Sequence, residues 1–126
     1  MRWLALLALA VLLAGCGAPA TPAGTGIQGA VTLGPTCPVQ RDPPDPRCAD
    51  RPYAANLTFE RGDGATVRAS SAPDGTFRVD AAPGTYTVRT TEGDAPRHPA
   101  CSTPQPIVVE AGRYTDAAVS CDTGIR

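Results

Sequence analysis

The chain is 126 residues long, the size of one domain, and eleven basic against twelve acidic residues give a net charge of −1. All the basic residues are Arg, and no basic stripe is present that would neutralise phosphates. This composition argues against nucleic-acid binding.

The first residues have the features of an export signal. Arg2 supplies a positive charge, the eleven residues Trp3–Leu13 are apolar, and small residues follow them. An apolar run of this length is too short to cross a hydrocarbon core of about 30 Å as a helix. We therefore predict that residues 1–15 are a signal peptide that is absent from the mature protein.

The end of the apolar run makes this prediction more specific. Leu13-Ala14-Gly15-Cys16 resembles the lipobox of bacterial lipoproteins. The resemblance implies that the Cys16 thiol receives diacylglycerol, that the chain is cut before Cys16, and that the new amino terminus is acylated. At about 0.8 kcal/mol per buried CH₂, several acyl chains make a lasting membrane anchor. Gly17, in place of the Asp that retains lipoproteins at the inner membrane, implies the outer membrane as the destination if the cell has one.

Residues 16–26 are predicted to be the lipidated Cys and a flexible tether of small residues and Pro. About ten such residues reach roughly 15–20 Å, so we expect the domain close to the membrane surface. The rest of the chain has few large apolar residues, with Leu33 and Leu57 as its only leucines. A small domain with so thin a core usually needs covalent staples.

From Ile27 onward apolar residues alternate with polar ones, and no apolar stripe of helical spacing and length occurs. Such alternation indicates strands with one buried face, and Gly, Pro and Asp mark turns between the runs. For residues 27–126 we predict an all-β fold, a seven-stranded Greek-key β-sandwich. The runs lie at 27–33, 53–60, 65–70, 77–79, 86–88, 107–109 and 115–119.

The turn after the second run contains Arg61-Gly62-Asp63, the letters of an integrin-type adhesion sequence. Asp-Gly is chosen at tight turns for backbone reasons. We therefore interpret the triplet as a hairpin turn rather than as an adhesion signal.

The last two runs predict a register. If Glu110-Ala111-Gly112 is a three-residue hairpin loop with Gly112 in the left-handed conformation, Val109 faces Arg113. The same register pairs residue 107 with 115, 105 with 117, 103 with 119, and 101 with 121. Pro104 and Pro106 interrupt this ladder.

Four cysteines remain once Cys16 is lipidated, and an exported protein favours disulfides among them. The register above places Cys101 opposite Cys121, which leaves Cys37 to pair with Cys48. The second bridge closes loop 34–52, which is too long to be left unfixed in a small domain.

Three motifs resemble those of the carboxypeptidase regulatory-like domain, a transthyretin-like (prealbumin-like) sandwich of seven strands related to Ig-like folds. They are Gly29-Ala30-Val31, Asp74-Gly75-Thr76-Phe77-Arg78-Val79 and Pro83-Gly84-Thr85-Tyr86-Thr87-Val88. Residues 34–39, 50–52 and 122–126 are similar to those of small secreted bacterial versions. In carboxypeptidases this domain is a non-catalytic appendage, so the resemblance implies no peptidase activity and brings no ligand-binding residues.

Two surface features are candidates for partner binding. Loop 34–52 holds six of the fourteen prolines, and it is either pre-organised for a partner or covers part of the sandwich. The tail 122–126 either docks on the domain through Ile125 or is a recognition tag. Arg51, Ile125 and Arg126 are the candidate partner contacts.

Catalysis has little support. His98 is the only His and lies between Arg97 and Pro99, as a solvated loop residue would. No serine has the Gly-x-Ser-x-Gly context of an activated nucleophile, which applies to Ser70, Ser71, Ser102 and Ser120. We expect no enzymatic activity.

Metal and cofactor binding are also not indicated. No C-x₂-C pair points to zinc. Asp42, Asp45 and Asp50 are separated by prolines and lack the regular spacing of a calcium loop. The sequence thus favours a non-catalytic, membrane-anchored envelope module with an envelope protein or polysaccharide as partner; a transthyretin-like small-ligand carrier and a weak hydrolase are the alternatives.

Overall fold

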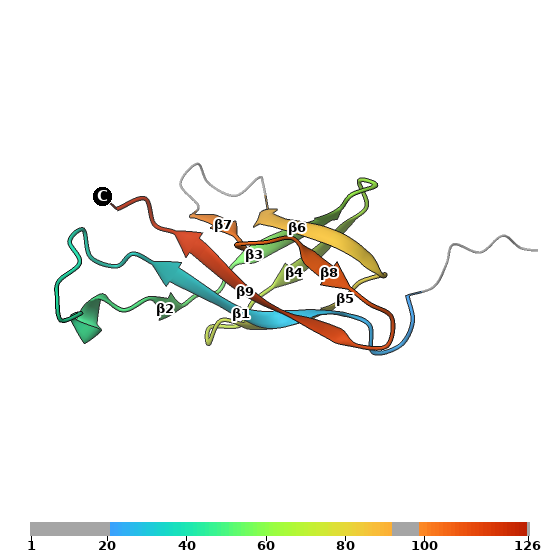
Figure 1. Cartoon of the computed structure of the whole chain (residues 1–126), viewed down its shortest axis with the longest axis horizontal. Helices are drawn as coiled ribbons and strands as arrows, with labels where there is room; N and C mark the ends of the chain where they lie inside the picture. The colour runs from blue at the N-terminus through green and yellow to red at the C-terminus, as the bar shows by residue number, and fades with distance from the viewer. Residues whose placement is uncertain (1–20, 92–98, 126) are drawn as a thin grey trace, which may run out of the picture.

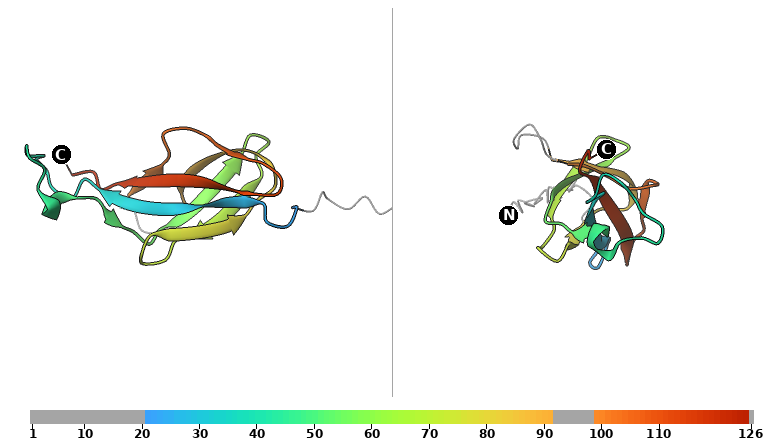
Figure 2. Two further views of the ribbon diagram at one scale, coloured as in Figure 1. Left: turned by 60° about the horizontal axis from the view of Figure 1, so that its bottom comes forward. Right: turned by 90° about the vertical axis from the view of Figure 1, so that its left-hand side faces the viewer.

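The computed structural model describes residues 21–91 and 99–125, so Cys16, His98 and Arg126 lie outside the described residues. Two β-sheets face each other and form a sandwich-like fold (Figures 1 and 2). In the described ranges the strands are β1 (Gly26–Gly34), β2 (Arg51–Pro52), β3 (Asn56–Arg61), β4 (Thr66–Ser70), β5 (Thr76–Asp80), β6 (Gly84–Thr90), β7 (Ala100–Ser102), β8 (Ile107–Val109) and β9 (Tyr114–Asp122), with a 3₁₀ helix at Pro46–Cys48.

The predicted all-β sandwich with two disulfides is confirmed, but the strand count is wrong: the described residues form nine strands, not seven. The two unpredicted strands, β2 and β7, have two and three residues. So short a strand shows no alternation in sequence. It exists because a longer neighbour, β1 or β9, offers its edge.

The five-stranded sheet is built around a parallel pair, β1 and β9. Their register runs over nine residue pairs, from Gly26 opposite Tyr114 to Gly34 opposite Asp122. On its other edge β1 pairs with β5 over residues 26–30 and with β2 over 32–33, while β7 pairs with the last part of β9. The four-stranded sheet has the order β4-β3-β6-β8 and is antiparallel throughout.

The predicted final hairpin is wrong in part. Cys101 does lie opposite Cys121, and Gly112 does adopt a left-handed φ of +85°. However, β8 pairs with β6 in the other sheet, and Ile107 faces Tyr86 rather than residue 115. The chain changes sheets between β7 and β8, where Pro104 and Pro106 have no N–H to donate to a ladder.

The core lies between the sheets and matches the predicted alternation. Its largest fully buried side chains include Tyr86, Phe59, Ile27 and Leu57. The Phe59 and Phe77 rings stack with centroids 5.7 Å apart, joining the two sheets. The Tyr86 hydroxyl donates to the Ala82 carbonyl at 2.7 Å, so the buried polar atom is satisfied.

Because β1 and β9 are parallel, the molecule has two distinct ends (Figures 1 and 2). At the entry end, residues 21–25 lead into β1 beside the turns 81–83 and 110–113; there Thr25 accepts N–H hydrogen bonds from Ala81 and Gly112. At the loop end, β1 and β9 both finish, and loop 34–52 lies beside residues 122–125. A nine-residue strand is roughly 30 Å long, which is the distance between the two ends.

Candidate functional site

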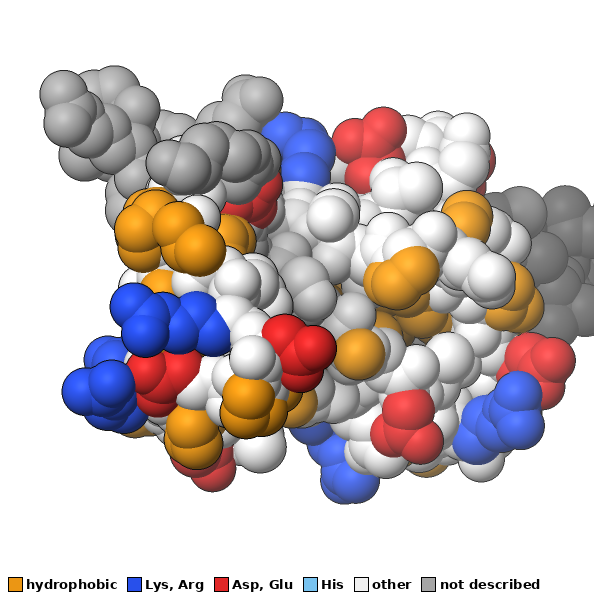
Figure 3. All heavy atoms as spheres, turned by 60° about the vertical axis from the view of Figure 1, so that its left-hand side comes forward, with side chains coloured by type: hydrophobic (Ala, Val, Ile, Leu, Met, Phe, Trp, Pro, Cys, Tyr) orange, Lys and Arg blue, Asp and Glu red, His pale blue; other side chains and the backbone are white. Residues whose placement is uncertain are grey.

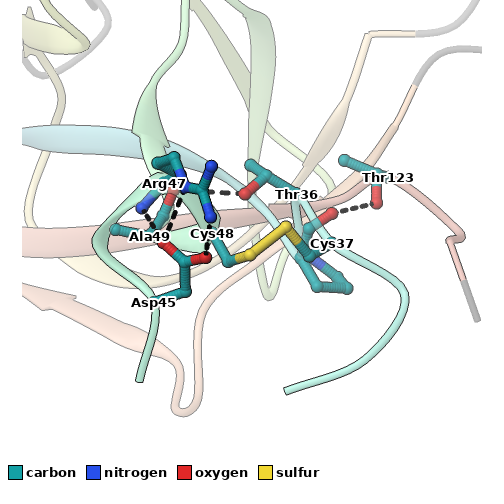
Figure 4. The surroundings of a disulfide bond; sticks show 8 residues. Thr36, Cys37, Asp45, Arg47, Cys48, Ala49 and Thr123 are labelled. Carbon is teal, nitrogen blue, oxygen red and sulfur yellow. Dashed lines mark hydrogen bonds and ion pairs between the residues drawn. A yellow bond between two sulfur atoms is a disulfide. The ribbon is translucent and has the colours of Figure 1, made fainter. Parts of the chain in front are cut away.

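The loop end is the candidate site. Loop 34–52 has no fully buried residue, yet a disulfide, a 3₁₀ helix and hydrogen bonds fix its shape. The disulfide between Cys37 and Cys48 closes it, with the two Cα atoms 5.2 Å apart (Figure 4). Next to the bridge, the Thr36 hydroxyl donates to the Ala49 carbonyl at 3.4 Å. Both disulfides indicate an oxidising, extracytoplasmic environment.

Asp45 starts the 3₁₀ helix Pro46–Cys48. Its carboxylate accepts the Arg47 backbone N–H at 2.9 Å, and Pro46 occupies the first helical position. Arg47 also donates through Nε at 3.1 Å and Nη2 at 2.9 Å to the same carboxylate, a bidentate pair. These hydrogen bonds from Arg47 hold the pKa of Asp45 below its ordinary value of 3.8.

The tail docks on the base of the loop through hydrogen bonds of Thr123. The Thr123 N–H donates to the Gly34 carbonyl at 3.0 Å, and the Thr123 hydroxyl donates to the Pro35 carbonyl at 2.7 Å. Figure 4 shows Thr123 reaching toward this segment. Ile125 is 40% exposed. Docking through Thr123 thus leaves Ile125 on the surface.

The surface of the loop end combines apolar and charged side chains. Val39, at 67% exposed, and Ile125 are two of the large hydrophobic side chains that the described part of the chain leaves exposed; Val108 in β8 is another, at 52%. Figure 3 shows basic, acidic and hydrophobic side chains beside one another on the side turned forward. Loop 34–52 carries three Arg and three Asp, so it presents no field of one sign.

Two shallow hollows of about 450 and 470 Å³ flank this loop. Arg41, Asp45 and Cys48 line both hollows, and Val39 lines the second. The hollows are open to solvent and lie outside the core. They can receive side chains of a partner, because their walls are fixed by the disulfide and by the Asp45–Arg47 pair.

The predicted contact residues are only partly gathered here. Arg51 lies in β2 with an exposed side chain, and its backbone is opposite Leu33 of β1. Arg51 and Ile125 both belong to the loop end. Arg126 and the predicted lipidation site Cys16 lie outside the described residues.

Two features of the site, the 3₁₀ helix that starts at Asp45 and the docking through Thr123, were missed from sequence alone. The Asp45-Pro46 pair is a helix-start signal that the sequence offered, since Asp is a preferred cap and Pro a preferred first residue. Thr123 had no such signal, because its partners Gly34 and Pro35 are distant in sequence and meet it only through the parallel β1–β9 pairing.

Two of the serines considered above, Ser70 and Ser71, have structural partners. The Ser71 hydroxyl accepts the Ala55 N–H at 2.8 Å and donates to the Tyr53 carbonyl at 2.7 Å. The Ser70 hydroxyl donates to the Asn56 side-chain oxygen at 2.7 Å. Over residues 21–91 and 99–125, no three His, Cys, Asp or Glu side chains come together as a metal site.

The Arg61-Gly62-Asp63 triplet forms the β3–β4 turn, as predicted. The Gly64 N–H donates to the Arg61 carbonyl at 2.8 Å, and the Arg61 and Asp63 side chains pair with each other at 2.6 Å. The hydrogen bonds from Arg61 lower the pKa of Asp63 to about 2. Both charged groups of the triplet are thus engaged within the turn.

A polar network on the outer face of the five-stranded sheet also went unpredicted. Gln28 of β1 donates to Asp116 of β9 at 2.9 Å and accepts from Arg78 of β5 at 2.7 Å. The Arg78 guanidinium lies 4.4 Å from the centre of the Tyr114 ring, and the Tyr114 hydroxyl donates to Asp80. The network links three strands, β5, β1 and β9, across the sheet.

Comparison with known proteins does not identify a relative: no protein-family model, no curated protein and no solved structure matches the chain. Within the residues that the structure describes, no helix has the length and apolar character needed to cross a bilayer.

Proposed function

We propose that this protein is a non-catalytic lipoprotein of the cell envelope that presents its loop end to a partner protein. The observation that carries the proposal is the polarity of the fold. Because β1 and β9 are parallel, residues 21–25 enter at one end, whereas loop 34–52 and the tail lie at the other. A lipid on Cys16 therefore leaves the loop end about one strand length further from the membrane than the entry end.

The chemistry of the loop end favours a protein as the partner. Exposed Val39 and Ile125 supply apolar contact area. Arg41 and Arg47, of a residue type enriched at protein interfaces, line the same hollow as Val39. Balanced charge gives no long-range attraction for a polyanion. No aromatic residue occurs between 34 and 52 to stack on a sugar ring, so a polysaccharide is a weaker fit. The resemblance to carboxypeptidase regulatory-like domains agrees with a non-catalytic role.

The anchor is tested with Cys16→Ser in intact cells. We expect the wild type to incorporate a labelled fatty acid and to sediment with membranes, and the variant to lose both properties. An unlabelled wild-type protein that is found in the soluble extracytoplasmic fraction would refute the anchoring half of the proposal.

The display surface is tested with a photo-crosslinking side chain at Val39, and at Val108 as the matched control. Both are exposed valines, but only Val39 lies at the loop end. We expect a discrete protein adduct from position 39 and none from position 108 in intact cells. Adducts to polysaccharide, or equal adducts from both positions, would contradict the choice of partner and of surface.

A further inference from the structure

The parallel strands β1 and β9 connect the two ends of the molecule by the shortest route. A pull on residues 21–25 draws β1 toward the entry end, and a pull on the tail draws β9 toward the loop end. The two strands are adjacent along nine residue pairs, so such a pull slides one strand past the other. All hydrogen bonds of the ladder are then loaded at once, rather than one after another.

A backbone hydrogen bond closes the β1–β9 ladder at each of its two ends. The Gly26 N–H donates to the Arg113 carbonyl at 3.2 Å, and the Thr123 N–H donates to the Gly34 carbonyl at 3.0 Å. Two residues before Thr123, the Cys101–Cys121 disulfide ties the end of β9 to β7 within the sheet. A force on the tail therefore reaches a covalently reinforced strand before it reaches the core.

A force on the loop takes an even more direct path. Between residues 26 and 34 the chain is a strand, already at about 3.2–3.4 Å per residue against a covalent maximum of roughly 3.3–3.6 Å. The Cys37–Cys48 disulfide limits how far the loop itself can lengthen. Tension between the entry end and the loop thus runs along the β1 backbone, and this part of the chain can lengthen very little.

From this geometry we infer that the domain is a load-bearing link, which keeps its fold under tension between the membrane and a partner held at the loop end. Its use in the cell rests on the proposed function, because the lipid and the partner supply the two attachment points. The mechanical property itself depends only on the fold.

Single-molecule force spectroscopy on the oxidised full chain tests the inference. One pair of handles sits on Ala23 and on a tag added after Arg126, which loads the β1–β9 ladder in shear. The control pair sits on exposed Ala54 and Ala72, beside the open end of the β3–β4 ladder, where Asn56 lies opposite Ser70. We expect the unfolding force between the first pair to be several-fold higher than the force that peels β4 away between the second pair. Equal forces would overturn the inference.

A matched pair of variants identifies the ladder as the element that resists. Ala30 and Ala118 are exposed, and they lie opposite each other in β1 and β9. The Val31 N–H bonds to Gly75 on the β5 side, so the alternation of the strand points the Ala30 N–H toward β9. The same alternation points the Ala118 N–H away from β1, because the Thr123 N–H, five positions on, faces it.

Ala30→Pro therefore removes a ladder donor, and Ala118→Pro removes none. We expect Ala30→Pro to lower the shear force strongly and Ala118→Pro to leave it near the wild-type value. An equal loss in both variants would show that the core, not the ladder, bears the load. If Ala30→Pro does not fold, the comparison of the two handle geometries on the wild type still decides.

A third pair of handles, on Ala23 and Arg41, tests whether tension runs along the β1 backbone. We expect no unfolding step at the forces that unfold the domain between Ala23 and the C-terminal tag, and a step there would contradict this route. A failed anchor or crosslinking experiment would leave these forces unchanged, so the two proposals fail separately.

Discussion

The two disulfides of this domain close loops of comparable length in very different surroundings. Cys101 and Cys121 are buried, at 5% and 1% exposed, and join two paired strands of one sheet. Cys37 and Cys48 are only half-buried and join the two sides of a surface loop. Their spacings are 20 and 11 residues, so loop-closure entropy alone predicts stabilities within about 0.5 kcal/mol of each other.

We expect a much larger difference, because a disulfide stabilises only when the native state stays ordered without it. If the Cys101–Cys121 disulfide is removed, β7 and β9 keep their place in the sheet. Only the unfolded chain then gains conformational freedom. Loop 34–52 is held mainly by its own bridge and by a few hydrogen bonds at its base. Without that bridge the native loop gains freedom too, and the two entropy gains largely cancel. Thus one bridge stabilises the fold and the other shapes the surface.

The largest effect is expected for the double variant Cys101→Ala, Cys121→Ala. Removing a disulfide from a small exported domain typically costs about 2–5 kcal/mol, and this one also leaves a gap in the core. Urea unfolding of the oxidised proteins measures the change. A loss below about 1 kcal/mol would mean that the β7–β9 pairing loosens when the bridge is removed, as loop 34–52 is expected to do.

The second variant, Cys37→Ser with Cys48→Ser, breaks the outer bridge. We expect a loss of about 1 kcal/mol or less in the free energy of unfolding. Faster amide hydrogen exchange should be confined to loop 34–52 and the tail that docks on its base. Equal losses for the two double variants would show that loop closure, rather than surroundings, decides the worth of each bridge.

The same contrast explains what the sequence could predict. Alternation predicted the core strands, since burial on one face leaves a two-residue period, as in Leu57 and Phe59. The position of Cys101 opposite Cys121 was predicted correctly, although the hairpin from which it was predicted does not form: β8 pairs with β6, not with β9. The count from Gly112 still gives the observed β7–β9 register, although residues 103–106 carry the chain to the other sheet before β8.

The loop end was less predictable because its contacts are non-local and its residues carry no period. The sequence identified loop 34–52 and the tail as surface features, and for the tail it left docking through Ile125 and a recognition tag as the two alternatives; it did not point to Thr123. The hydroxyl and the backbone N–H of Thr123 hold the tail at the base of the loop. The acceptors are the carbonyls of Gly34, at the end of β1, and of Pro35, just after it, and the sequence does not show that β1 lies beside β9.

A smaller effect tests this docking. Thr123→Val keeps the shape of the side chain but removes the donor to Pro35, so we expect a loss of about 0.5–1.5 kcal/mol. Faster exchange should appear at the base of the loop, around Gly34. Thr66→Val in the exposed edge strand β4 is the control and should change stability by less than about 0.5 kcal/mol. If both variants behave alike, the tail is not held by Thr123.

The smallest effect concerns charge within the loop. Hydrogen bonds from Arg47 lower the pKa of Asp45, so the folded carboxyl is a stronger acid than the unfolded one. The resulting stabilisation is present above the ordinary value of 3.8 and is lost as the pH falls through the lower, folded pKa. Arg47→Gln should therefore raise the pKa of Asp45 toward 3.8 in an NMR titration, whereas Arg41→Gln should leave it unchanged. Because the Asp45 carboxylate also caps the 3₁₀ helix, acid should loosen this turn of the loop while β7 and β9 stay protected. If acid instead speeds amide exchange in β9 over the same pH range, the loop is coupled to the rest of the fold. The two disulfides would then not act independently on the fold and on the loop.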